Sequence, residues 1–262
     1  MKKIFSISVT VATLLVASCG KDNDNRTPSG TLLLAKASIQ PAGTTTTFTY
    51  DDQKRMIKAA SVFSNPKNDN TITFTYDAQG LLVEYVKDYA DPIYEDTKTA
   101  VVYLTPGNDF VGADIYSMSN LSMPQSSLDF EFSANKITRI NYKADGITAS
   151  GKTEITLAEG ANNTSVIKEY KITGGVPTLL STENYSDYDD KNSPYGFYPR
   201  EYKLLVSGIL TSVNNYKKLK ATDDLTGEVS TYNYTYQYNA EGYVSKRTSE
   251  SGETITYEYM YQ

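Results

Sequence analysis

The sequence predicts an all-β fold, an antiparallel up-and-down meander curled into a barrel or half-barrel with at most one short helix. Tyrosine occupies every second position of residues 231–238. Successive side chains of a strand point to opposite faces, so Tyr232, Tyr234, Tyr236 and Tyr238 share one face. Similar alternating stretches recur along the chain with hairpin-length connections, which is typical of antiparallel sheets.

About sixteen such strands are expected between residue 31 and the C-terminus. The first, at 31–39, ends at the turn-forming residues Pro41 and Gly43. The other candidates alternate apolar or aromatic side chains with polar ones, and they lie at 44–50, 56–63, 72–76, 81–89, 99–104, 110–116, 130–132, 136–142, 152–157, 165–172, 179–185, 231–238, 243–248 and 255–261. No composition shift divides them, so we expect a single domain over 31–262.

Three of the expected turns share one pattern. Phe48-Thr-Tyr50-Asp51, Phe74-Thr-Tyr76-Asp77 and Tyr236-Gln-Tyr238-Asn239 superpose without gaps. The Asp or Asn can bond the backbone of its own turn. Gly80 and Gly242 stand at the fourth turn position, where a type I turn with a bulge requires a left-handed residue, and Lys54 departs from this rule. These units resemble YD repeats, the tyrosine-aspartate hairpins of Rhs-type proteins, although no regular period joins them.

One interruption breaks the strand pattern. A proline-containing loop at 188–199 precedes the only helix-like spacing of the chain, at 200–214. Tyr202, Leu205, Ile209 and Val213 would lie on one side of this helix. Gly208 weakens the helical pattern.

Composition excludes several kinds of chemistry. The chain has 23 tyrosines but no tryptophan and no histidine, and Cys19 is its only cysteine. Histidine triads, Cys–His pairs and histidine or cysteine zinc sites are therefore impossible within the chain. The net charge is −6 and no basic block occurs, so the electrostatic footprint of nucleic-acid binding is absent. We expect no cofactor, no metal and no nucleic-acid partner.

The N-terminus predicts export. Lys2 and Lys3 precede an apolar run at 4–16, which is too short to span a bilayer but suits a signal peptide. The following Val16-Ala-Ser-Cys19 resembles the lipobox of bacterial lipoproteins. This resemblance implies a lipoprotein signal peptide at 1–18, cleavage before Cys19 and lipid attachment at its sulfur. The alternative is an ordinary secretory leader with an incidental cysteine.

Residues 19–30 are expected to form a lipidated, flexible tether. They are polar and lack periodicity. The acidic stretch at 20–25 resembles the export signal of Bacteroidetes-type surface lipoproteins, which implies a position on the cell surface. A periplasm-facing anchor is the alternative.

A wider resemblance rests on Tyr188-Asp-Asp-Lys-Asn-Ser-Pro-Tyr195 and on 232–246 together with the lipobox. These features resemble a Bacteroidetes-type family of surface lipoproteins of unknown function, described as having a porin-like β fold. The resemblance spans most of 31–262. It implies no catalytic residues, and Tyr195 departs from the phenylalanine that is common in the family after the proline.

Two groups of residues are candidates for a site. Tyr232, Tyr234, Tyr236 and Tyr238 could contact a ligand such as a sugar, but their alternation with polar residues favours the buried face of a sheet. Asp187, Asp189, Asp190 and Asn192 offer oxygen ligands for calcium, but they lack the EF-hand pattern, which favours a solvated loop.

A membrane-spanning barrel is disfavoured, because its lipid-facing strand faces should be aliphatic with aromatics gathered at two girdles. We therefore expect an outer-membrane protein, lipid-anchored at Cys19, that acts as a non-catalytic binding or accessory module. Its partners would be the membrane, through the anchor, and a glycan or an envelope protein. Two alternatives stay open: a hydrolase that uses two carboxylates, and a structural partner of an outer-membrane complex.

Overall fold

The computed structural model describes residues 30–104, 109–158, 163–207 and 211–262. Sixteen strands account for most of them. They are β1 (Leu32–Gln40), β2 (Thr44–Tyr50), β3 (Met56–Val62), β4 (Asn70–Tyr76), β5 (Leu82–Tyr89), β6 (Thr97–Leu104), β7 (Asp109–Ser117), β8 (Ser126–Ser133), β9 (Lys136–Lys143), β10 (Ala149–Leu157), β11 (Thr164–Thr173), β12 (Val176–Tyr188), β13 (Tyr216–Asp223), β14 (Val229–Tyr238), β15 (Val244–Ser249) and β16 (Thr254–Tyr261).

The strands form a closed antiparallel barrel in which each strand pairs with its neighbours in sequence. The predicted meander is confirmed, and of the two predicted shapes the structure has the barrel. The barrel closes where β1 pairs with β16, from Leu32 opposite Tyr261 to Gln40 opposite Thr254. An ion pair between Lys36 Nζ and Glu258 Oε1 (3.0 Å) crosses this seam. Closure leaves no unpaired strand edge.

The two ends of the barrel differ. At one end, which we call the tether end, the backbone of Thr31 exchanges hydrogen bonds with that of Gln262 (3.0 and 3.1 Å). Residues 19–30, the expected tether, therefore join the barrel here. The turns that follow the odd-numbered strands lie at the opposite end, which we call the mouth.

The three turns with the shared sequence pattern have the same geometry, and all lie at the tether end. In each, the side chain of the opening Asp51, Asp77 or Asn239 accepts a hydrogen bond from the backbone N–H four residues on, at 2.8–2.9 Å. Lys54 has a φ of 65°, so it adopts the left-handed conformation that Gly80 and Gly242 adopt in the other two turns. Lys54 thus replaces the glycine of the other two turns without a change in turn geometry.

Tyrosine hydroxyls tie neighbouring strands at this end. On six even-numbered strands, a tyrosine near the strand end donates a hydrogen bond to a backbone carbonyl near the start of the preceding strand, at 2.5–2.9 Å. The pairs are Tyr50–Leu34, Tyr76–Met56, Tyr103–Leu82, Tyr188–Thr164, Tyr236–Tyr216 and Tyr259–Val244. Since turns join each even strand to the next strand, turns and ties alternate around much of the rim.

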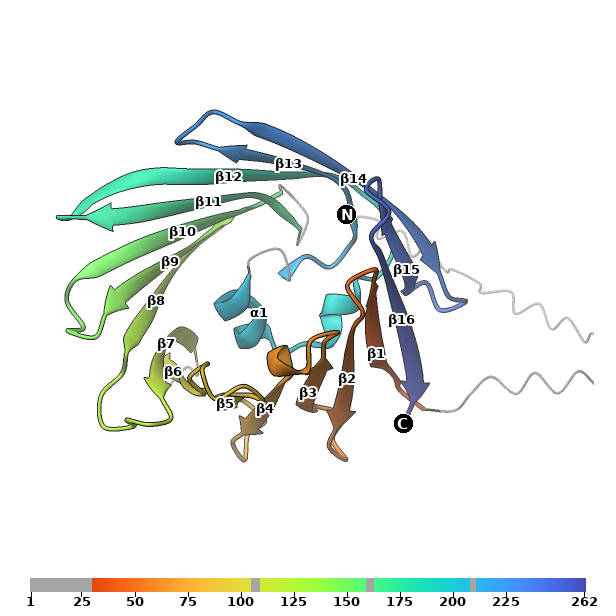
Figure 1. Ribbon diagram of the computed structural model, residues 1–262, viewed down its shortest axis with the longest axis horizontal. Helices are drawn as coiled ribbons and strands as arrows, with labels where there is room; N and C mark the ends of the chain where they lie inside the picture. Colours follow the sequence, from red (N-terminus) through yellow and green to blue (C-terminus); the bar gives the residue numbers. More distant parts are fainter. Residues whose placement is uncertain (1–29, 105–108, 159–162, 208–210) are drawn as a thin grey trace, which may run out of the picture.

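The connection between β12 and β13 fills part of the lumen. We call its described residues, 189–207 and 211–215, the plug; it contains the 3-10 helix η2 (Pro194–Phe197) and the helix α1 (Arg200–Val206). Figure 1 shows α1 inside the ring of strands. The prediction of one short helix is confirmed, but α1 ends at Val206 because Ser207 has an extended backbone. Of the predicted apolar face, Ile209 lies outside the described residues and Val213 lies beyond the helix.

The plug organises the core into two clusters. Tyr202 of α1 packs with residues of β1–β5, β15 and β16, including Phe74, whose ring centroid lies 5.1 Å from that of Tyr202. Leu204 and Leu205 pack with residues of β7–β12. Helix α1 therefore connects the two halves of the barrel, because it contributes residues to both clusters.

The outer wall is polar. Strands β2 and β4 turn aromatic side chains inward and threonines outward, so that Phe48 and Phe74 are buried whereas Thr47, Thr73 and Thr75 are exposed. On β9 and β10, Lys136 and Lys152 flank the Glu154 carboxylate, at 3.0 and 2.9 Å. Among the described residues, no helix has the length and apolar character needed to cross a bilayer.

Candidate functional site

The tyrosine ladder of β14 faces the barrel interior. Its four tyrosines are spaced along the lumen from the mouth toward the tether end, because the strand begins at the mouth and ends at the tether end. Tyr232 is 43% exposed. Tyr234 makes an edge-to-face contact with Tyr216 (centroids 5.3 Å apart) and carries the Arg247 guanidinium over its ring, at 4.9 Å. Of the four tyrosines, only Tyr232, next to the mouth, is therefore open to a ligand.

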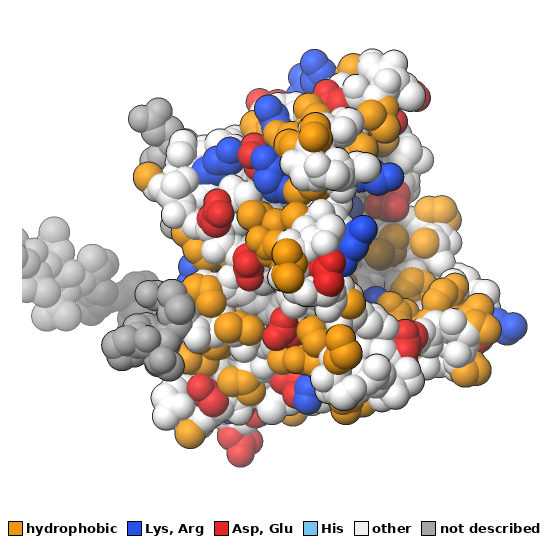
Figure 2. Space-filling model, turned by 90° about the vertical axis from the view of Figure 1, so that its left-hand side faces the viewer, with side chains coloured by type: hydrophobic (Ala, Val, Ile, Leu, Met, Phe, Trp, Pro, Cys, Tyr) orange, Lys and Arg blue, Asp and Glu red, His pale blue; other side chains and the backbone are white. Residues whose placement is uncertain are grey.

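A groove of about 240 Å³ surrounds Tyr232 on the inner wall near the mouth. Its lining comes from three adjacent strands and the turn between two of them. It consists of Ser181, Glu183, Ala221, Thr222, Asp223, Glu228, Ser230 and Tyr232. Hydroxyl groups and carboxylates thus lie around one aromatic ring. The space-filling view shows a hollow at its right-hand side, with hydrophobic, acidic and basic side chains around it (Figure 2).

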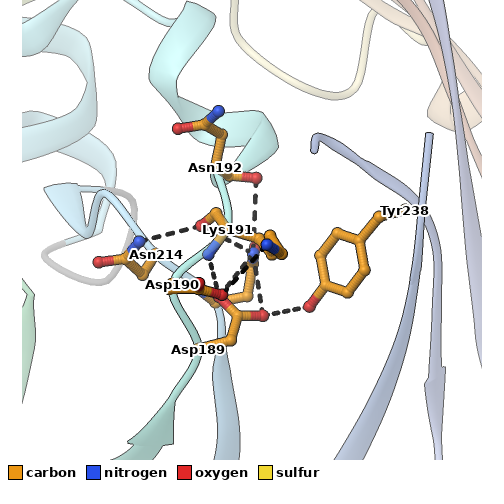
Figure 3. Close-up of polar contacts among 7 residues, drawn as sticks. Asp189, Asp190, Lys191, Asn192, Asn214 and Tyr238 are labelled. Atoms are coloured by element: carbon orange, nitrogen blue, oxygen red, sulfur yellow. Dashed lines mark hydrogen bonds and ion pairs between the residues drawn. The ribbon is translucent and has the colours of Figure 1, made fainter. Parts of the chain in front are cut away.

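The other half of the ladder is structural. The hydroxyl of Tyr236 donates to the Tyr216 carbonyl (2.6 Å), and that of Tyr238 donates to Asp189 Oδ2 (Figure 3). Burial raises the pKa of Tyr236, whereas burial together with the Asp189 carboxylate raises that of Tyr238. Both hydroxyls therefore stay protonated and act as donors. The predicted buried sheet face describes these two residues.

Asp189 holds the two ends of the plug together. Its Oδ1 accepts hydrogen bonds from the backbone N–H of Lys191 (3.0 Å) and of Asn215 (3.2 Å), and its own N–H donates to the Asn215 carbonyl (3.1 Å). Figure 3 shows Asp189 among these partners, with Tyr238 of the wall reaching it from one side. This clamp fixes where the plug leaves and rejoins the wall.

The acidic stretch at 187–190 is therefore not uniformly a solvated loop. Asp189 is the clamp, and Asp190 is exposed and pairs with Lys191 Nζ (3.4 Å). Asp187 has a φ of 57°, an uncommon backbone conformation for a residue other than glycine. In the part of the chain that the structure describes, no three acidic side chains gather as metal ligands.

Two adjoining cavities lie between the plug and the wall. The first has a volume of only about 10 Å³, and its lining is polar and aromatic: Ser193, Pro194, Tyr195, Ser212, Asn214, Asn215, Tyr216, Tyr236, Arg247 and Tyr257. The second, of about 160 Å³, is mostly apolar; its lining is Leu34, Ala37, Ile39, Thr46, Pro194, Tyr195, Tyr198, Ile255 and Tyr257. The two cavities share three lining residues, Pro194, Tyr195 and Tyr257. Burial raises the pKa of Tyr257 well above its ordinary value.

A second inward arginine, Arg139 of β9, serves the plug. Its Nη1 donates to the carbonyls of Leu204 (3.3 Å) and Leu205 (2.7 Å). These carbonyls belong to the last turn of α1, where a helix leaves them without helical partners. Its Nη2 donates to Thr153 Oγ1 (3.0 Å). Arg139 therefore fastens the plug to the wall.

The sequence interpretation missed Glu183 and Arg247. Arg247 faces inward opposite Tyr236, whereas its neighbour Lys246 faces outward opposite Gln237. Only the strand register distinguishes these two basic residues. The one sequence signal for the inward direction of Arg247 was the alternation that places Tyr236 on the inner face, continued through the hairpin turn at Asn239 into the next strand. The predicted lipid site, Cys19, lies outside the described residues.

The sequence matches no family profile and no curated protein. Among solved structures, the chain is similar to a porin-like protein from Bacteroides vulgatus, with 10% sequence identity and a TM-score of 0.46. The similarity covers 87% of this chain and 99% of that one.

Proposed function

We propose that this protein is a non-catalytic binding barrel that a lipid at Cys19 tethers to the outer membrane and that takes a glycan in the groove around Tyr232. The observation that carries this proposal is the exposed Tyr232 ring in a concave, polar part of the lumen. The lipobox resemblance and the polar stretch at 19–30 support the tether. The acidic residues at 20–25 support the cell surface as its location.

The groove offers the two kinds of contact that a sugar requires. A sugar presents C–H groups on one face and hydroxyls around its edge. The exposed ring of Tyr232 suits the first, and the hydroxyls of Ser181 and Ser230 with the carboxylate of Glu183 suit the second. A concave site with a few placed polar groups is typical of small-ligand binding.

The outer wall supports a barrel that stands in water. A bilayer-facing strand face is apolar, and a lysine or arginine at its midplane costs about 2–4 kcal/mol. Here the outward positions carry threonines and ion pairs, including Lys136 and Lys152 around Glu154. A lipid anchor then provides the attachment that the wall does not.

Glycan-array binding by a soluble protein of residues 30–262, followed by calorimetry on the best glycan, tests the site. Tyr232→Ala is expected to weaken binding about ten-fold or more with unchanged melting temperature, since the aromatic contact is lost. Thr231→Ala, on the outer face of the same strand, is the matched control and should bind normally. Equal affinity of both variants and the parent would refute the Tyr232 site.

The anchor has a separate test. Mass spectrometry of the exported protein should find the mature chain starting at a lipidated Cys19, and Cys19→Ser should release the protein from the membrane fraction. Protease treatment of intact cells then distinguishes the surface from the periplasm-facing alternative. An unmodified Cys19 in the exported protein would contradict the anchor without affecting the groove.

The carboxylates of the groove favour binding over hydrolysis. Tyr185 donates a hydrogen bond to Glu183, and Asp223 Oδ1 accepts the N–H groups of Leu225 and Thr226, both at 2.9 Å. The hydrogen bond from Thr226, first among several, lowers the pKa of Asp223, which suits it poorly as a general acid. Release of reducing ends from the bound glycan, abolished by Glu183→Gln, would establish the hydrolase instead.

The apolar side chains of the mouth favour a second candidate, a structural partner of an envelope complex. Of the fifteen exposed large hydrophobic side chains among the described residues, ten lie on the mouth loops or adjacent strand ends: Val62, Ile93, Tyr94, Met118, Leu121, Met123, Ile147, Val176, Leu225 and Val229. Because the tether joins the opposite end, this rim would face away from the anchoring membrane, so its partner would be a protein.

Measuring the mass of the full-length protein after mild-detergent extraction from its native membrane tests this candidate. The candidate would be supported by a complex that dissociates when Ile93→Asp and Leu121→Asp are combined. The same complex should stay intact with Val102→Asp on the outer wall. A monomer in the unmodified protein would rule it out.

A further inference from the structure

The paired cavities beside the plug carry a chemistry that the Tyr232 groove does not. Among the residues that the structure describes, Arg247 is the only charged one in the lining of either cavity. A guanidinium has five N–H donors and stays charged at every accessible pH. Among the described residues, the hydrogen bonds of Arg247 are limited to one with Glu253 Oε1, at 3.4 Å. Most of its donors therefore remain available at the cavity.

The surroundings of Arg247 hold its side chain in the lining of the polar cavity rather than on the molecular surface. Its side chain is only 14% exposed, lies over the ring of Tyr234 and shares the polar cavity with Ser193 and Ser212. Glu253, its partner, is 45% exposed and sits toward the mouth turn. Because this ion pair is long, at 3.4 Å, and its Glu253 side is solvated, a ligand carboxylate can displace Glu253.

The adjoining cavity supplies an apolar contact on the other side of Tyr195 and Tyr257. Leu34, Ile39 and Ile255 line it together with the Tyr198 ring. Its volume of about 160 Å³ is roughly ten times the space that one water requires. Filling it with an aliphatic chain would bury apolar surface that otherwise faces water.

We propose that these cavities bind a small amphipathic carboxylate, with its head on the Arg247 guanidinium and its aliphatic tail among Leu34, Ile39 and Ile255. A carboxylate suits the guanidinium because two parallel N–H···O bonds can form. The absence of any carboxylate side chain from both linings disfavours a cationic ligand. The site is separate from the Tyr232 groove and does not depend on glycan binding.

Calorimetric titration of the folded barrel with hexanoate tests the proposal, with hexanol and acetate as controls for the tail and the head. Hexanoate is expected to bind with a dissociation constant below about 1 mM and at least ten-fold more tightly than either control. Arg247→Gln should weaken hexanoate about ten-fold or more and leave hexanol unchanged. Lys246→Gln, the outward neighbour, should have no effect.

Two further variants keep the test decisive if Arg247→Gln fails to fold. Glu253→Gln removes the competing carboxylate and should tighten hexanoate binding about two- to five-fold. Ala37→Leu reduces the apolar cavity and should weaken hexanoate and hexanol alike. Absence of hexanoate binding, or a Glu253→Gln variant that binds it less tightly, would overturn the proposal. Glycan binding at Tyr232 should be unchanged in all of these variants, so the two sites can fail independently.

Discussion

At the scale of single residues, the tyrosine hydroxyl matters as much as the ring. The six ties at the tether end each satisfy a backbone carbonyl near the start of a strand, where the ladder is often irregular, as at the shift between Thr49 and Tyr50 opposite Met56. A buried carbonyl without a partner costs about 1–3 kcal/mol. The ring buries apolar area, and the hydroxyl closes the rim.

Tyr76→Phe tests this role because it keeps the ring and removes one tie. We expect a loss of about 1–2 kcal/mol in the free energy of unfolding, since the Met56 carbonyl loses its donor. Urea denaturation measures the change. Tyr116→Phe is the control, because the Tyr116 hydroxyl makes no hydrogen bond among the described residues, and equal effects of the two substitutions would contradict the tie.

Glu154 predicts a pH dependence. Burial alone would raise its pKa, but Lys152 and Lys136 outweigh burial and lower the pKa from an ordinary 4.5 to about 2. The ionised form is therefore favoured in the folded state. Its contribution is complete above pH 4.5 and disappears as the pH falls toward 2. Glu154→Gln should cost about 1 kcal/mol or less at pH 7, because the pairs are partly solvated, and nothing near pH 2. A pH-independent difference in urea denaturation would contradict this.

At the scale of elements, the plug decides what the lumen can hold. It enters and leaves at the Asp189 clamp and is fastened by Arg139 at the end of α1. Helix α1 has only seven residues, too few to be stable alone, so its order depends on the wall. Hydrogen bonds from the wall, such as that of the Thr164 N–H to Ser212 Oγ (2.9 Å), also hold the plug where it lines both cavities.

Arg139→Gln is expected to loosen the plug. The substitution removes the donors to Leu204 and Leu205, with an expected loss of about 2 kcal/mol and faster hydrogen exchange of amides in 200–207. Lys58→Gln, on the exposed outer face of β3, should change neither the stability nor the exchange. Unaltered exchange in 200–207 after the Arg139→Gln substitution would show that Arg139 does not hold α1 in place.

The repeating elements were predictable and the plug was not. Local alternation sets the strands, and the Asp or Asn that opens the turn sets three of the tether-end turns, so much of the meander follows from near neighbours in sequence. Lys54 shows that one turn tolerates a non-glycine. The plug depends on contacts such as Asp189–Tyr238 and Arg139–Leu205, which join distant segments that no local pattern links. The same applies to Arg247, whose inward direction follows from register alone.

At the scale of the whole molecule, the barrel combines a filled lumen with a polar outer wall. Aromatic and aliphatic side chains and the plug occupy the inside, and threonines and ion pairs cover the strands outside. This arrangement is the one that the proposed tethered barrel requires.

Adjacent positions of β4 test this inside-out assignment. Thr75 faces outward opposite Glu84, and Phe74 is buried. Thr75→Lys should change the free energy of unfolding by no more than about 0.5 kcal/mol in detergent-free buffer, whereas Phe74→Lys should prevent folding. A barrel that requires detergent to stay monomeric, or that loses about 2–4 kcal/mol on Thr75→Lys, would face lipid instead.

The seam between β1 and β16 has a consequence for how the molecule is made. Lys36 and Glu258 are 222 positions apart, whereas every other strand pair is joined by a local connection or by the plug. Strand β16 must therefore be synthesised before β1 can pair with it, and until then the edge of β1 that faces β16 is unpaired. Loop closure over such a length is entropically costly, so we expect sealing of the cylinder to be the late step of folding.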